Sequence, residues 1–253
     1  MPLTFQSASG CPEHSRGIAE ALIAHGLISR EEQDPDGLLL ACGPEGLTLT
    51  ARGANQQLSL HLDFVCGPQG YRLAHAGHAR EDLVRALGRL PGGSTVIDAS
   101  TGLGRDSLVL AARGFQVIAL ERHPILAALF SDALQRAAGH DALDPLLTRL
   151  DFHQADAGEW LAKNDLLFDA AVFDPMFPPR RKDAAVKKEM QIVHQLMGAN
   201  ADPDAPATLA TLRRHVRRRV VVKRPLHAPH LGNQTPAHEL RGRSTRFDIY
   251  LPG

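Results

Sequence analysis

The chain has 253 residues, which is enough for one large α/β domain and a small appendage. Lys plus Arg and Asp plus Glu both total 28, so the formal net charge is zero and gives no long-range steering toward nucleic acid. The three cysteines are odd in number and lack a C-x-x-C spacing, so they indicate neither a disulfide framework nor a zinc site, and a reducing compartment is expected.

The N-terminal segment 1–10 lacks the basic start and the apolar core of a signal peptide. No apolar run in the chain approaches the roughly 18 residues that a membrane span needs. The sequence therefore predicts a cytoplasmic protein without membrane contact.

Residues 1–78 are predicted to form a small N-terminal α+β cap domain. A helix is expected over 13–25, where apolar residues recur at helical spacing. Strand-like segments follow at 38–41, 47–50 and 58–65, and the last two alternate polar and apolar residues as half-buried antiparallel strands do.

Residues 79–253 show alternating helices and short strands, the pattern of βαβ units around a parallel sheet. Helices are predicted at 80–90, 105–113 and 124–138, and strands at 95–98, 116–120, 150–154, 168–173 and 219–223. A final segment, 246–251, alternates polar and apolar residues, which predicts an antiparallel strand at an edge of the sheet.

A glycine-containing turn from Asp98 to Asp106 follows the first of these strands and opens a helix. Gly102 and Gly104 permit a tight turn and let backbone N–H groups approach a ligand closely. Glu121 ends the next strand, where an acid can hold both ribose hydroxyls of a nucleoside. A third glycine of the dinucleotide pattern is missing, and Asp98 suits an ammonium better than a pyrophosphate. These features favour S-adenosylmethionine over a dinucleotide.

Asp174, Pro175, Met176 and Phe177 directly follow the apolar strand at 168–173. Ligands of open α/β sheets bind at the carboxyl ends of the strands. The Asp174 carboxylate can accept hydrogen bonds from a planar amine, and the Phe177 ring can stack on a base that has left its stack. This loop therefore predicts a site for an amino group on an aromatic ring. The alternative is a structural loop in which Asp174 caps the next helix.

These motifs resemble the ribosomal small subunit methyltransferase J family. The resemblance rests on the segments 98–106, 120–122, 174–190, 220–225 and 246–250, and the run Lys187-Lys188-Glu189-Met190 is its most distinctive part. It implies a class I S-adenosylmethionine-dependent methyltransferase fold, Rossmann-like, with a mostly parallel seven-stranded sheet. It also implies methylation of the exocyclic N2 amine of a guanine in 16S ribosomal RNA, with that RNA or the assembled 30S particle as partner.

The resemblance also assigns residues, and no metal ligands are expected among them. Asp174, Pro175 and Phe177 are the expected catalytic residues. Together with the turn residues, the expected cofactor contacts are Asp98, Gly102, Gly104, Arg105, Asp106, Glu121, Arg122, Asp156, Ala157 and Asp174. At Asp156 and Ala157 relatives often carry small hydroxyl residues instead.

Two basic segments are candidates for an RNA surface, because phosphate contacts fix the register of a nucleic acid on a protein. The candidate residues are Arg180, Arg181, Lys182, Lys187, Lys188, Lys223 and Arg224. The alternative is that such charge runs are solvated faces of helices.

Other functions remain open at this stage. A methyltransferase acting on an adenine N6 or a protein glutamine amide uses a similar acid-proline-aromatic loop, although a second proline is usual where this chain has Met176. A nicotinamide-dependent oxidoreductase lacks support, since the third glycine is absent. A non-catalytic RNA-binding protein is the fourth possibility.

Overall fold

The computed structural model describes residues 3–30, 37–52, 57–75, 81–177, 188–198 and 202–253. The chain folds into two compact units, each described here by itself. Unit 1 comprises 1–64, 124–138 and 177–201, and unit 2 comprises 65–123, 139–176 and 202–253. Within the described residues, no helix has the length and apolar character needed to cross a membrane.

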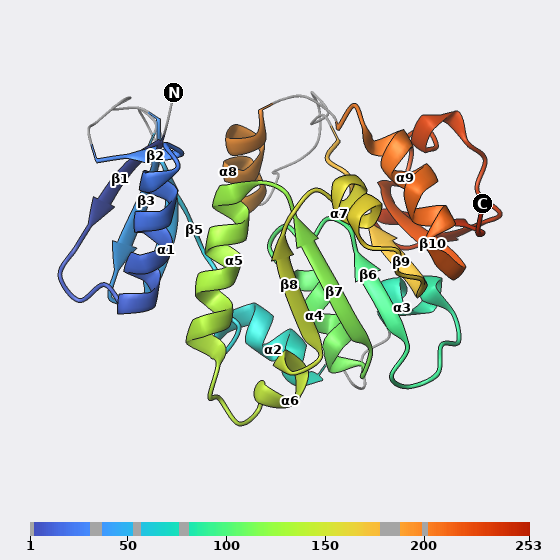
Figure 1. The fold of residues 1–253 in the computed structure, drawn as a ribbon, viewed down its shortest axis with the longest axis horizontal. Helices are drawn as coiled ribbons and strands as arrows, with labels where there is room; N and C mark the ends of the chain where they lie inside the picture. The colour runs from blue at the N-terminus through green and yellow to red at the C-terminus, as the bar shows by residue number, and fades with distance from the viewer. Residues whose placement is uncertain (1–2, 31–36, 53–56, 76–80, 178–187, 199–201) are drawn as a thin grey trace. The chain divides into compact units, whose positions relative to one another are not determined.

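Unit 1 contains a five-stranded sheet in the order β2-β1-β3-β4-β5. The strands β3, β4 and β5 form an antiparallel meander, and β1 pairs in parallel with β2 and β3 (Figure 1). Helix α1 packs on β3 and α5, and helix α8 packs on β4 and β5. The elements are β1 (Leu3–Ser7), α1 (Glu13–Ala24), β2 (Ile28–Ser29), β3 (Leu38–Gly43), β4 (Gly46–Ala51), β5 (Leu58–His61), α5 (Pro124–Ala137) and α8 (Lys188–Met197).

A buried carboxylate holds the parts of unit 1 together. Asp132 of α5 is fully buried and accepts hydrogen bonds from Ser15 Oγ of α1 at 2.5 Å and from the Leu47 backbone N–H of β4 at 3.1 Å. The Arg136 guanidinium donates to the same carboxylate at 2.9 Å and to the Leu62 carbonyl at 2.5 Å. These bonds explain why an acid occupies an apolar helix face.

Replacing Asp132 with Ala is therefore expected to destabilise the protein by about 3 kcal/mol, because it leaves the Arg136 charge and two further buried donors without their acceptor. Urea unfolding followed by tryptophan fluorescence and circular dichroism measures the loss. Exposed Asp151, changed to Ala, is the matched control and should leave the free energy of unfolding within about 0.5 kcal/mol of wild type.

The structure corrects one expectation drawn from the cysteines. Cys11 and Cys42 are joined by a disulfide between the segment before α1 and strand β3, with their Cα atoms 5.5 Å apart. Spacing rules detect frameworks of several cysteines, and a single pair separated by 31 residues leaves no such signal. Cys66 is exposed and is not part of this disulfide.

Unit 2 is built on a seven-stranded sheet in the order β11-β12-β10-β9-β6-β7-β8 (Figure 1). The five strands from β10 to β8 run parallel, and β12 and β11 add antiparallel pairs at one side. This confirms the predicted Rossmann-like sheet. The strands are β6 (Thr95–Asp98), β7 (Gln116–Glu121), β8 (Leu150–Gln154), β9 (Phe168–Phe173), β10 (Val216–Pro225), β11 (His238–Arg241) and β12 (Thr245–Tyr250).

Helices cover both faces of this sheet. Helix α4 packs on β6, β7 and β8 together with α2 and α6, while α7 and α9 pack together on the opposite face (Figure 1). The core on that second face contains Phe168, Leu209, Leu212 and Val220, each at most 3% exposed. The helices are α2 (Gly67–His75), α3 (Asp82–Leu87), α4 (Arg105–Ala112), α6 (Asp144–Leu147), α7 (Ala157–Lys163), α9 (Ala205–Arg214) and the short 3-10 helix η1 (Leu231–Asn233).

Two sequence expectations differ from this arrangement. The segment at 246–251 does form an antiparallel strand, but β11 lies outside it, so the prediction that it is the edge strand was wrong. The polar sequence of β11 gave no strand pattern. The compact units also do not follow a single boundary at residue 78: α2 belongs to unit 2, and α5 and α8 belong to unit 1. A cap domain formed by 1–78 alone stays a prediction.

Strands β6 and β9 are neighbours in the sheet, and the chain winds outward in opposite directions from them. Such a switch of direction leaves a crevice at the carboxyl ends of the two strands, where ligands bind in this class of fold. The turn after Asp98 and the loop at Asp174 both begin there.

Candidate active site

The glycine turn after β6 adopts the conformation that its glycines permit. Gly102 and Gly104 have φ angles of 55° and 75°, in the left-handed region that strains residues with a Cβ atom. Gly104 directly precedes α4, so the free backbone N–H groups of the helix start lie at the turn. The Thr101 N–H donates to the Leu120 carbonyl at 2.9 Å, which ties the turn to the end of β7.

Glu121 at the end of β7 is 6% exposed and bonded on both sides. Its Oε2 accepts the Gly102 N–H at 2.8 Å, and its Oε1 accepts the His123 N–H at 2.7 Å. Burial raises the pKa of this carboxyl, while the two N–H donors oppose the rise. Each carboxylate oxygen keeps a second lone pair, so this rigid group can still accept hydroxyl hydrogen bonds from a ribose.

Asp98 at the end of β6 is 2% exposed. Its carboxylate accepts hydrogen bonds from the Ser107 hydroxyl at 2.5 Å and from the Ser100 N–H at 3.2 Å. These bonds stabilise the turn between β6 and α4. Burial raises the pKa of Asp98 to about 7. Direct contact with a cofactor ammonium stays a prediction, since the carboxylate is already engaged within the turn.

Asp174 directly follows β9 and lies beside the same turn. Its backbone N–H donates to Ser100 Oγ at 2.6 Å, and its side chain is 44% exposed. The following residue, Pro175, is buried. Desolvation raises the pKa of Asp174, and the Lys223 ammonium, 2.9 Å from Oδ2, opposes the rise. An accessible carboxylate with one fixed cationic partner can accept a hydrogen bond from an incoming amine.

Asp106, in the first turn of α4, is connected to Asp174 through an ion pair that each carboxylate makes with Lys223. The distance from Lys223 Nζ to Asp106 Oδ2 is 2.9 Å, and Arg72 lies 3.5 Å from the other oxygen of the same carboxylate. Arg72 also donates two hydrogen bonds of 3.0 Å to Glu81. These cations hold the pKa of Asp106 below its ordinary value despite burial. Arg105, its neighbour, lines a pocket of about 390 Å³ with Asp106 and Lys223.

Arg122 follows Glu121 and faces three carboxylates. It is paired with Asp202, lies 2.9 Å from Asp204 and lies 3.8 Å from Asp156. Asp156 is the N-cap of α7 and accepts the N–H groups of residues 158 and 159. The next residue, Ala157, is buried in the first turn of that helix.

Asp202 and Ser100 were not predicted as site residues, because neither belongs to a recognisable motif. The Asp202 carboxylate accepts the Met176 N–H at 3.0 Å and also pairs with Arg122, so it connects the loop after β9 to the end of β7. Ser100 receives the Asp174 N–H. Asp202 and Asp204 both bond to Arg122, which lies about 80 residues away along the chain.

Comparison with known proteins identifies the family. A family model described as a putative SAM-dependent methyltransferase matches residues 22–252. Ribosomal RNA small subunit methyltransferase J of Thioalkalivibrio sulfidiphilus is 40% identical over 245 residues, which cover 95% of each chain. The chain belongs to the ribosomal RNA small subunit methyltransferase J family.

Further relatives agree with this membership. Ribosomal RNA small subunit methyltransferase J of Neisseria gonorrhoeae is 40% identical over 208 residues, 81% of each chain. A crystal structure of a SAM-dependent methyltransferase from the same organism superposes with a TM-score of 0.73 at 29% identity, covering 98% of this chain and 96% of that one. The methyltransferase J family thus accounts for the predicted fold, and S-adenosylmethionine is the cofactor of the class to which the chain belongs.

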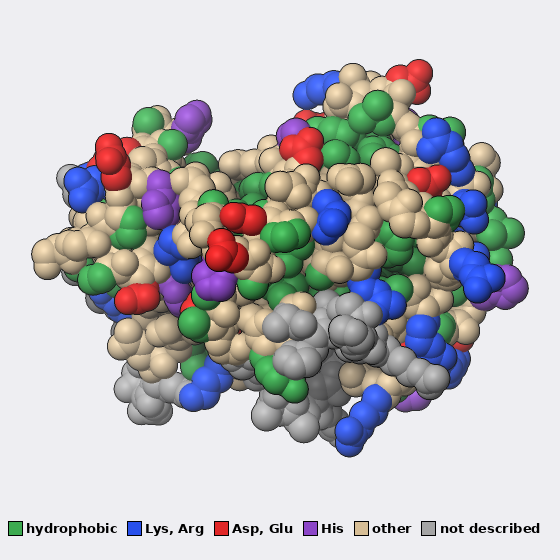
Figure 2. All heavy atoms as spheres, turned by 90° about the horizontal axis from the view of Figure 1, so that it is seen from below, with side chains coloured by type: hydrophobic (Ala, Val, Ile, Leu, Met, Phe, Trp, Pro, Cys, Tyr) green, Lys and Arg blue, Asp and Glu red, His purple; other side chains and the backbone are tan. Residues whose placement is uncertain are grey.

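The residues expected to bind RNA differ in their exposure and in their contacts. Arg180, Arg181, Lys182 and Lys187 lie outside the described residues, and Lys188 is exposed at the start of α8. Lys223 is bonded to two carboxylates, as described above. On the face shown in Figure 2, the Lys and Arg side chains of the described residues lie in separate groups.

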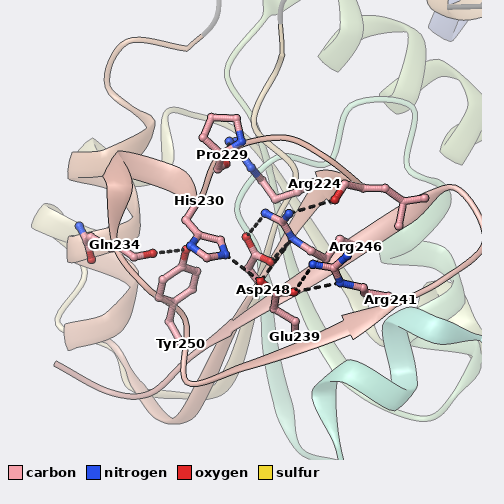
Figure 3. Close-up of polar contacts among 10 residues, drawn as sticks. Arg224, Pro229, His230, Gln234, Glu239, Arg241, Arg246, Asp248 and Tyr250 are labelled. Atoms are coloured by element: carbon pink, nitrogen blue, oxygen red, sulfur yellow. Dashed lines mark hydrogen bonds and ion pairs between the residues drawn. The ribbon is translucent and has the colours of Figure 1, made fainter.

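Arg224 does not fit the predicted RNA surface, because it is 3% exposed and donates a hydrogen bond to the Pro229 carbonyl. It lies in a polar network of β10, β11 and β12 (Figure 3). There Asp248 accepts two hydrogen bonds from Arg246 at 2.6 and 2.9 Å. A phosphate could reach Arg224 only by opening this network.

The same network contains His230, Glu239 and Asp248, whose ligand atoms lie within 4.8 Å of one another. Glu239 accepts hydrogen bonds from His230 at 2.7 Å and from Arg241 at 2.9 Å, and Arg246 occupies both oxygens of Asp248 (Figure 3). Guanidinium groups already neutralise both carboxylates within their own strands, and Arg246 of β12 also lies 4.0 Å from Glu239 of β11, so the ion pairs connect the two antiparallel strands.

The ionisation of Asp98 predicts how cofactor affinity depends on pH. With a pKa of about 7, Asp98 is mostly neutral at pH 6 and mostly ionised at pH 7.5, and only the ionised form attracts the cofactor ammonium. Affinity for S-adenosylmethionine is expected to rise over this range by up to about eightfold, the change in the ionised fraction. Above about pH 8 the cofactor amine itself loses its proton.

Isothermal titration at several pH values measures this effect, with Asp98→Asn as the matched variant. The variant is expected to bind with little change between pH 6 and 7.5. An equal pH dependence in both proteins would mean that Asp98 acts only as a brace of the turn.

Proposed function

We propose that the chain transfers the methyl group of S-adenosylmethionine to the exocyclic N2 amine of a guanine in 16S ribosomal RNA. The observation that carries this proposal is the placement of the Asp174 carboxylate beside the turn of β6, at the switch point of the sheet. The names of the relatives support an RNA of the small ribosomal subunit as substrate. The cytoplasm, where this RNA is found, is the proposed location.

The residues around the crevice fit the proposed cofactor. Glu121 offers two fixed carboxylate oxygens for the ribose hydroxyls, and the start of α4 offers backbone N–H groups with the Arg105 side chain nearby. Asp98, in its ionised form, adds negative charge next to the turn. When bound, the cofactor supplies an electrophilic methyl group on a sulfonium.

The task of the protein is then to align the amine with that methyl group for an in-line displacement. Positioning of this kind can contribute about 7 to 11 kcal/mol to a reaction. Asp174 accepts a hydrogen bond from one N2–H, which draws electron density toward the nitrogen and orients its lone pair. The same carboxylate can take the proton once the methyl group has moved. We propose that Phe177 stacks on the target base, and that Pro175 fixes the loop that carries both residues.

The test is transfer of tritiated methyl groups from S-adenosylmethionine to 16S RNA and to 30S particles that lack the modification. Digestion to nucleosides should recover the label as N2-methylguanosine, and comparison of the two substrates tells free RNA from the assembled particle. Label in N6-methyladenosine or in the protein fraction would refute guanine specificity. RNA labelling no greater than that of a heat-inactivated enzyme would refute the proposed function.

A further inference from the structure

Lys223 has contacts that point to a role beyond RNA binding. It follows Val222 of β10, which pairs with Phe173 of β9, so its side chain emerges next to Asp174. Its Nζ lies 2.9 Å from Asp174 Oδ2 and 2.9 Å from Asp106 Oδ2. We propose that Lys223 is a positioning residue that keeps the Asp174 carboxylate ionised and fixed in direction. This rests on the proposed function of Asp174 as the amine acceptor.

The surroundings of Asp174 would otherwise disfavour its negative charge. The other charged groups that face it are Asp106 of α4, Asp98 of β6 and Arg224 of β10. Two of these are acids, and Arg224 is held in its own network. An RNA base entering the crevice would also displace the water that now solvates the exposed part of Asp174. A directly bonded cation offsets both effects.

Lys223 is suited to this task because it stays charged. The Asp174 carboxylate, together with Asp106, raises the pKa of the ammonium above its ordinary value. Asp106 is itself fixed by Arg72, whose guanidinium is anchored on Glu81. The Lys223 ammonium is therefore fixed by Asp106 on one side while it contacts Asp174 on the other.

A phosphate contact by Lys223 is a poorer reading of the same geometry. Two carboxylate oxygens already lie 2.9 Å from the ammonium, so a phosphate bound there would be repelled by both acids. The side chain is 30% exposed, and it borders the pocket that Arg243 lines from the β11–β12 turn. Arg243 carries a positive charge at that pocket and is not among the charged groups that face Asp174, which makes it the matched control.

The first measurement follows the Asp174 carboxyl by carbon NMR in the free protein, with the resonance assigned by its loss in Asp174→Asn. Lys223→Met is expected to raise the pKa of Asp174 by at least about one unit, since an adjacent opposite charge commonly shifts a carboxyl by one to three units. Lys223→Arg should keep it near the wild-type value, and so should Arg243→Met. An unchanged pKa in Lys223→Met would overturn the proposal, whether or not the protein methylates RNA.

The second measurement is the pH dependence of kcat on the RNA substrate. For Lys223→Met, the acid limb of the kcat profile should move to higher pH by the same amount as the pKa of Asp174. On that limb kcat then falls about tenfold for each pH unit by which the limb moves and recovers as the pH rises, while the KM for RNA changes little. Lys223→Arg should restore the wild-type profile. A phosphate contact would instead raise KM, lower the salt dependence of binding and leave the kcat profile in place. That result, or a uniform loss at every pH, would overturn the proposal.

Discussion

Replacing Asp174 with Ala is expected to lower kcat for methyl transfer by roughly 10² to 10⁴-fold, while the Kd for S-adenosylmethionine stays within about threefold of wild type. The carboxylate lies at the end of β9 with its backbone fixed by Ser100 and its side chain accessible. Loss of this acceptor removes the group that orients the amine. Cofactor binding should survive because the turn of β6 and Glu121 are bonded to each other and not through the Asp174 side chain.

Single-turnover transfer and isothermal titration measure these two quantities separately. Asp174→Asn is the matched variant, since it keeps the shape and one acceptor oxygen but loses the charge. It should retain more activity than Asp174→Ala and still fall well below wild type. A kcat near the wild-type value in Asp174→Ala would refute the proposed mechanism, because the amine would then not depend on this carboxylate.

The fold of unit 2 could be predicted from the sequence because most of its strands are recognisable from their own local residue pattern. Segments 95–98, 150–154 and 168–173 are short runs between turn residues, and the structure has strands at the same positions. The β11 segment, His238–Arg241, gave no such signal, because three of its four residues are polar and do not alternate with apolar ones. It forms a strand by pairing with β12, where Arg246 lies 4.0 Å from Glu239. The alternation of helices and strands predicted a parallel sheet, whereas the edge strand β11 was not predicted.

The site was only partly accessible, because sequence shows which residues follow a strand but not what they face. Asp98, Glu121 and Asp174 stand at strand ends, and the structure brings all three into hydrogen-bond contact with the turn after β6. Lys223 and Arg224 were predicted to bind RNA because they are adjacent basic residues. In the structure Lys223 is bonded to two acids and Arg224 is buried. Those environments arise from β9 and β12, which are distant in sequence.

Replacing Glu121 with Ala is expected to weaken S-adenosylmethionine binding by about 100-fold or more. The physical reason is twofold. Hydrogen bonds to a charged group contribute about 1.5 to 3 kcal/mol each, and the carboxylate would accept two from the ribose. Its removal also leaves the Gly102 and His123 N–H groups without their acceptor, so the turn loses one of its links to the end of β7.

Isothermal titration with S-adenosylhomocysteine measures this loss without turnover, and Glu121→Gln separates the two causes. The amide keeps an acceptor for one backbone N–H but lacks the charge, so its affinity should lie between Ala and wild type. Glu159→Ala is the control, since that acid lies in α7 and is not bonded to the turn. Unchanged affinity in Glu121→Ala would place the ribose elsewhere, and the Glu121 carboxylate would then serve only to hold the glycine turn against the end of β7.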